Sequence, residues 1–230
     1  MSTSSTTTFK LNWDQTGNKL YETGVDRGVL YVQSSSGTYP KGVVWDGITA
    51  FSENPSGAEA TPLYADNVKY LNLTSAEEYG FNIEAYSSPA EFDECDGSAE
   101  LAPGVSIGQQ SRKTFGFCCR TVIGNDTNSN AHGYKLHLIY GAMASPTERS
   151  YSSINESPEA MTLSWECSTT PVSIPGYKPT ACIIIDSTKV DAAKLAAFEA
   201  ILYGSGTTEA TLPLPDAVKT HFATASNPTT

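Results

Sequence analysis

The residues Tyr134-Lys135-Leu136-His137-Leu138-Ile139-Tyr140 decide the fold class of this 230-residue chain. Their larger apolar side chains fall on every second position, which is typical of a β-strand with one buried face. Similar alternation, or a short β-branched run, recurs at residues 29–32, 43–51, 79–85, 115–119, 161–168 and 182–185. Because clusters of Gly, Pro, Asn and Ser separate these stretches, the sequence predicts a mainly antiparallel β protein.

One α-helix is predicted near residues 191–203. Asp191 can cap its N-terminus, and Gly204 stands where a helix often ends in a left-handed residue. An apolar stripe with helical spacing is expected to lie on the sheet; it consists of Leu195, Phe198 and Leu202. A shorter helical turn is expected from Pro89, with Phe92 facing the core.

The predicted organisation is one β domain, residues 13–204, between two polar arms, residues 1–12 and 205–230. Within the domain, the stretch 52–66 has two prolines and no periodicity. It is too long for a hairpin turn, so we expect a long loop there. Connections of this length in a compact domain are usually functional or disordered.

The charge balance is strongly acidic, with 14 Lys and Arg against 25 Asp and Glu, a formal net charge of −11. Tight nucleic-acid binding needs clustered cations, so the balance argues against it, although not against DNA passing by. No apolar run approaches the ~20 residues of a membrane span, and residues 1–8 have no signal-peptide core. We therefore expect a protein made and kept in a cytosol, without membrane contact.

The cysteines are odd in number and irregularly spaced: Cys95, Cys118, Cys119, Cys167 and Cys182. This pattern indicates reduced, mostly buried thiols rather than a disulfide framework. On a strand, the adjacent Cys118 and Cys119 would point to opposite faces.

One motif resembles the nucleophile elbow of serine hydrolases, Gly104-Val105-Ser106-Ile107-Gly108. Asp126 with His132 or His137 would be the partners in the chain order of that class. The elbow requires a strand-to-helix turn, but no helix is predicted after Ser106, so a turn bearing glycines is favoured.

No other chemical motif is complete. Asp126, Asn128 and Asn130 begin like a calcium loop, but Ala131 and His137 replace its essential Gly and Glu, so a polar hairpin loop is favoured. Three histidines without a C-x-x-C pair are a weak zinc signal. The acidic residues at 93, 94 and 96 fit the solvated side of a short helix. We therefore predict no catalytic, cofactor or metal site.

Longer blocks of the chain resemble the major tail proteins, the tail-tube subunits, of long-tailed phages (siphoviruses) of Gram-positive bacteria. The blocks are residues 13–31, 37–47, 62–66, 86–95, 108–115, 133–141, 157–160, 202–204 and 212–216. They span nearly the whole chain.

The resemblance implies a structural virion protein, not an enzyme, with the tail-tube fold: β-sandwich or barrel-like antiparallel sheets and one flanking helix. It implies hexameric rings that stack around a tape measure protein, with the tail terminator and distal tail proteins as further partners. The tube would be assembled in the host cytoplasm and would carry DNA during ejection without binding it tightly. Two alternatives remain: a tube protein of a phage-like particle, such as a tailocin or defective prophage, and a serine hydrolase using Ser106.

Two sets of residues follow from this expectation. Alternation predicts that Met161, Leu163, Trp165 and Cys167 face the core, and that the channel is lined by Thr162, Ser164 and Glu166. The long loop would contact the next ring through Asn54, Ser56, Glu59 and Thr61.

Overall fold

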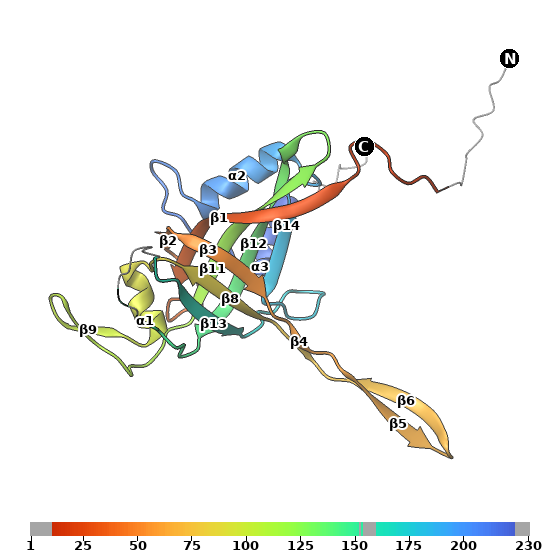
Figure 1. Ribbon diagram of the computed structural model, residues 1–230, viewed down its shortest axis with the longest axis horizontal. Coiled ribbons are helices and arrows are strands. Elements are labelled where there is room, and N and C mark those ends of the chain that lie inside the picture. The colour runs from red at the N-terminus through yellow and green to blue at the C-terminus, as the bar shows by residue number, and fades with distance from the viewer. Residues whose placement is uncertain (1–10, 152, 154–159, 224–230) are drawn as a thin grey trace, which may run out of the picture.

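The computed structural model describes residues 11–151, 153 and 160–223. A single antiparallel sheet of eight strands forms the body, with the two C-terminal helices on one side and two hairpins projecting from it (Figure 1). Along the sheet the order is β2 (Gly42–Trp45), β1 (Leu20–Val32), β11 (Phe115–Asn125), β12 (Ser129–Ala144), β13 (Leu163–Thr169), β8 (Gly80–Ala85) and β3 (Ile48–Glu53), while β14 (Cys182–Asp186) also pairs with β12. The predicted mainly antiparallel β class is confirmed.

Strand β12 joins two parts of the sheet because it changes partner along one edge. Its residues 135–139 pair with β14, and its residues 142–144 pair with β13. Gly141 separates the two regions with a φ of +61°, which glycine adopts without strain. A Cβ atom there would lie 2.3 Å from the carbonyl oxygen of Thr170.

The first half of the core lies inside the curved sheet. Its centre is an aromatic group around Trp45, whose ring centroid is 4.6 Å from that of Phe92 and 5.3 Å from that of Trp165. Strands β8, β11 and β13 each send alternate residues into this interior cluster, including Phe81, Ile83, Phe115, Phe117, Cys119, Trp165 and Cys167.

The second half of the core lies between the opposite sheet face and two helices, α2 (Ala192–Leu202) and α3 (Pro215–Phe222). Leu136, Leu138 and Tyr140 pack there, as the alternation in β12 predicts. The predicted helix is confirmed: the Asp191 side chain accepts a hydrogen bond from the Lys194 backbone N–H at 2.9 Å. Its stripe is buried, and Gly204 follows with a φ of +78°.

The expectation of one flanking helix followed by a polar C-terminal arm over residues 205–230 is wrong for residues 205–223. Leu212 is buried and bridges to Tyr39, and α3 then packs on α2. Pro215 starts α3, and Val218 turns inward. Helix α3 is short and mostly polar, so its apolar positions were not recognised in the sequence. Residues 224–230, and residues 1–10 of the predicted N-terminal arm, lie outside the described part.

A short 3₁₀ turn, η1 (Ala90–Phe92), leads into α1 (Asp93–Asp96). Phe92 is buried, as predicted. No helix in the described ranges is both long and apolar enough to cross a membrane.

The predicted loop at 52–66 is also wrong, because most of that stretch is strand. It contains the end of β3, β4 (Ser56–Gly57) and β5 (Ala60–Ala65). These pair with β7 (Glu77–Glu78) and β6 (Val68–Thr74), which lie outside the predicted loop. Together they form a long hairpin, residues 54–79, here called the arm, which projects from the body (Figure 1). A second, shorter hairpin consists of β9 (Ala99–Ala102) and β10 (Val105–Ile107).

Candidate assembly interface

The arm has one apolar face. Opposite residues in its register share a side, so Leu63 and Leu71 lie together, as do Thr61 and Leu73. We call this side the leucine face; its members are Thr61, Leu63, Ala65, Val68, Leu71 and Leu73. Its four large side chains are 38–62% exposed. The opposite side carries Pro62, Tyr64, Lys69 and Asn72.

The tip of the arm is a tight turn at Asp66 and Asn67, whose φ angles are +51° and +65°. Two consecutive positive φ angles define a type I′ turn, which suits a two-residue hairpin. Every residue of β5 and β6 is exposed. Since an isolated two-stranded hairpin is only marginally stable in water, this arm is suited to packing against another surface.

The predicted contact residues all lie on the arm, but only Thr61 belongs to the leucine face. Ser56 pairs with Glu78 in the first part of the arm, and the Asn54 N–H donates to the Gly80 carbonyl at 2.8 Å. Glu59 lies between β4 and β5. Sequence reasoning missed the residues of β6, although Asp66-Asn67 between two strand-prone runs is a hairpin signal.

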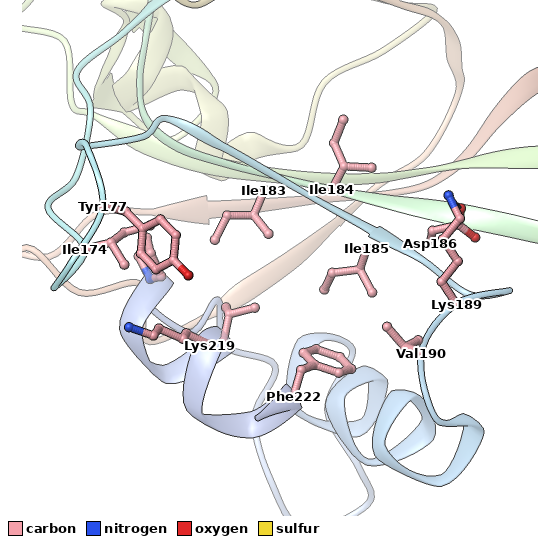
Figure 2. Close-up of a pocket in the computed structure, with 12 residues that line it drawn as sticks. Ile174, Tyr177, Ile183, Ile184, Ile185, Asp186, Lys189, Val190, Lys219 and Phe222 are labelled. Atoms are coloured by element: carbon pink, nitrogen blue, oxygen red, sulfur yellow. Dashed lines mark ion pairs between the residues drawn. The ribbon is translucent and has the colours of Figure 1, made fainter. Parts of the chain in front are cut away.

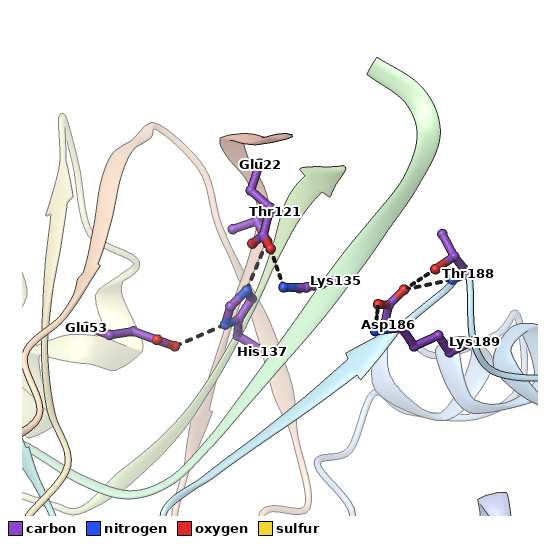
Figure 3. Close-up of polar contacts among 8 residues, drawn as sticks. All are labelled: Glu22, Glu53, Thr121, Lys135, His137, Asp186, Thr188 and Lys189. Atoms are coloured by element: carbon purple, nitrogen blue, oxygen red, sulfur yellow. Dashed lines mark hydrogen bonds and ion pairs between the residues drawn. The ribbon is translucent and has the colours of Figure 1, made fainter. Parts of the chain in front are cut away.

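A partly buried polar network fixes the root of the arm to the body, and Figure 3 shows its members Glu53, His137 and Thr121. Glu53 ends β3 and accepts a hydrogen bond from the Tyr79 hydroxyl at 2.9 Å. The same carboxylate oxygen lies 3.1 Å from Nδ1 of His137, whose Nε2 is 2.9 Å from the Thr121 hydroxyl. Burial raises the pKa of Tyr79, which keeps its phenol protonated as a donor. His137 is therefore a histidine with both ring nitrogens occupied.

The residues predicted to line a channel lie on or beside the outer face of β13. Trp165 and Cys167 are buried and Glu166 is exposed, as the alternation predicts. Met161 is an exception: it precedes the strand and is 39% exposed, so its predicted core position is wrong. Thr162 also precedes the strand and is exposed.

Neighbouring strands extend this outer surface. Ser164 lies opposite Glu84 and donates a hydrogen bond to the Asn82 side chain at 3.0 Å. We call the surface the polar sheet face; its members are Ala50, Ser52, Asn82, Glu84, Ser164, Glu166 and Ser168. None of them carries a positive charge.

A groove lies between the outer edge of β14 and α3 (Figure 2). Its volume is about 490 Å³, and its wall is mostly apolar: Ile174, Tyr177, Ile183, Ile184, Ile185, Val190, Pro215, Val218 and Phe222. Its charged side chains are already engaged. Lys189 pairs with Asp186 at 3.0 Å, and Lys219 donates to the Pro175 carbonyl at 3.0 Å. Burial acts to raise the pKa of Asp186, but hydrogen bonds from Thr188 and Lys189 hold it below its usual value.

The hydrolase motif lies in the wrong structural context. Ser106 is in strand β10 of the short exposed hairpin, and Gly104 forms its turn with a φ of +77°. Of the proposed partners, Asp126 accepts from the Gly17 N–H at 2.9 Å, and His137 is held in the network above. The nucleophile elbow therefore does not form.

The other motifs take structural roles. The polar hairpin-loop prediction is confirmed, since the Asn125 side chain accepts from the Thr127 and Asn128 N–H groups between β11 and β12. In α1, Glu94 pairs with Lys113, and Asp96 with Arg112 and Arg149. Across the described ranges, no group of three or more His, Cys, Asp or Glu forms a candidate metal site.

All five cysteines are free thiols, and four are buried. Cys118 faces the helices and Cys119 faces the interior cluster, as their adjacency predicts. Burial raises the pKa of Cys118 to about 12 and that of Cys182 to about 11.

Comparison with known proteins gives little further guidance. No protein-family model matches the chain. No curated protein matches it. Among solved structures it is similar to a chain in the cryo-EM structure of an extracellular contractile injection system, the PVC sheath-tube complex in its extended state, with 11% identity and a TM-score of 0.31. The similarity covers 70% of this chain and 88% of the other. At that TM-score the similarity carries no functional argument.

Proposed function

We propose that this chain is a structural subunit of a phage tail tube, which self-assembles into hexameric rings that stack into a tube. The observation that carries the proposal is the arm, because an exposed hairpin with a leucine face is explained by contact with another subunit. The sequence resemblance to siphovirus major tail proteins points to the same role.

The sheet edges also suit lateral assembly. Strands β2 and β3 end the main order of the sheet, and β14 pairs only with β12 among the described strands. Unpaired edges are templates for pairing with another chain, and closing strands of several subunits into one barrel removes them.

The charge of the polar sheet face is suited to a channel through which DNA passes. Glu84 and Glu166 supply negative charge, and none of the seven residues that define that face is a cation. Each Lys or Arg facing DNA would release counterions on binding phosphate and so favour retention. We propose that this face, including Thr162 at its border, lines the channel through which DNA is ejected.

The proposed partners are other copies of this chain, the tape measure protein inside the tube, and the tail terminator and distal tail proteins at its ends. The proposed location is the virion tail, assembled in the bacterial host cytoplasm. A tailocin or defective prophage particle would use the same subunit, and the DNA content of purified particles distinguishes these cases. No cofactor is proposed.

Electron microscopy of the purified protein over time tests the proposal. Negative staining is expected to show rings and then tubes that lengthen with concentration. A folded monomer that forms neither rings nor tubes at any concentration would contradict it. For the hydrolase alternative, diisopropyl fluorophosphate is expected to leave Ser106 unlabelled.

A further inference from the structure

We propose that the leucine face of the arm in one subunit docks into the β14–α3 groove of a second copy. This inference rests on the proposed self-assembly and names the surface that receives the arm. Neither the resemblance nor the sequence comparisons assign a role to this groove.

The arm cannot fill the groove of its own chain. Figure 1 shows the arm leaving the body beyond β3 and β8 and pointing away from the helices, whereas the groove lies against α3. The network of Glu53, Tyr79 and His137 holds the arm root in this orientation. A second copy is therefore the source of any arm that reaches the groove.

The two surfaces are chemically complementary. The leucine face presents Leu63, Leu71 and Leu73. The groove has a volume of about 490 Å³ and a mostly apolar wall. Because Lys189 and Lys219 are already engaged, the groove has few free polar groups to fix a small polar ligand. An apolar protein segment is the better fit.

Electrostatic attraction and the unpaired backbone edge of β14 would orient the arm in the groove. Figure 2 shows Lys219 at one end of the groove; its hydrogen bond goes to the neutral Pro175 carbonyl, so its positive charge can attract Asp66 at the tip of the arm or Glu59 near its root. Opposite charges at the rim favour correct register more than affinity. The outer edge of β14 also has no strand partner among the described residues, so an arm strand can add backbone hydrogen bonds there.

Cysteine cross-linking between copies tests the contact. Leu71→Cys protein is mixed with Lys189→Cys protein, allowed to assemble, oxidised mildly, and analysed for the cross-linked peptide pair by mass spectrometry. The Lys189 side chain is 78% exposed, so the second thiol is accessible. The matched control is Leu101→Cys on the short hairpin, where Leu101 is 68% exposed.

A cross-link between positions 71 and 189, with none between 101 and 189, supports the docking. Tubes that form without the 71–189 cross-link overturn the docking and leave the tail-tube function standing. Failure of the unmodified protein to assemble overturns both.

A pair of substitutions gives an independent measurement. Leu71→Asp should raise the concentration needed for assembly by about 10- to 100-fold, because it removes the free energy gained by burying one leucine side chain. Tyr64→Asp lies on the opposite side of the arm and should leave that concentration nearly unchanged. Equal effects of the two substitutions would contradict docking through the leucine face.

Discussion

At Gly141 the chain has a positive φ and no room for a Cβ atom, and the change of partner along β12 occurs at this residue. Gly141→Ala places a methyl group against the Thr170 carbonyl at a positive φ. We expect a loss of roughly 1–3 kcal/mol in the free energy of unfolding, measured by urea denaturation. Gly108→Ala is the control, since a Cβ atom there meets nothing within 4 Å. Equal midpoints for the two variants would show that Gly141 is not required.

The buried thiols predict how stability depends on pH. Burial raises the pKa of Cys95 and Cys118 from 9.0 to about 12, so the folded state keeps protons that the unfolded state loses. Stability should therefore be unaffected by these groups below pH 9 and should fall as pH rises from 9 towards 12. Urea midpoints across this range test the sign. A midpoint that rises with pH over the same window would contradict it.

At the scale of elements, α2 depends on its cap. Asp191→Ala removes the acceptor for the Lys194 N–H and should cost about 1 kcal/mol in the free energy of unfolding. Asp191→Asn retains an acceptor and should cost much less. Thermal unfolding of both variants provides the comparison.

The arm is an element that the body does not need for folding, because every residue of β5 and β6 is exposed. Gly57 pairs with Glu77, so replacing residues 58–76 by Asn-Gly closes β4 and β7 with a two-residue turn. This variant should remain a folded monomer with nearly unchanged thermal unfolding and should form no long tubes. Tubes of normal length, seen by negative staining, would show that the arm does not join subunits.

At the scale of the whole molecule, the assembled tube is expected to depend on the charge of the polar sheet face. Glu166→Lys tubes should assemble normally but slow genome ejection, with the delay relieved at higher salt. Glu209→Lys makes the same charge change at an exposed position outside that face. Ejection rates that match between the two variants would argue against a channel role for Glu166.

Local sequence patterns were enough to predict the β class, the helix with its Asp191 cap, and the inward side of Trp165 and Cys167. These features depend on periodicity and capping, which are local and can be recognised without a partner strand. The four residues predicted as inter-ring contacts lie on the arm, which was predicted as a loop, and their contact role stays a prediction.

Three features became visible only in the folded chain: part of residues 52–66 pairs with β6 and β7, Leu63, Leu71 and Leu73 share one face, and α3 packs on α2 to border a groove. Pairing register and packing join residues distant in the chain, so no local pattern specifies them. The extra residue in β6 at the register shift between Leu63 and Tyr64 places Val68 opposite Ala65 and so extends the leucine face to the tip of the arm.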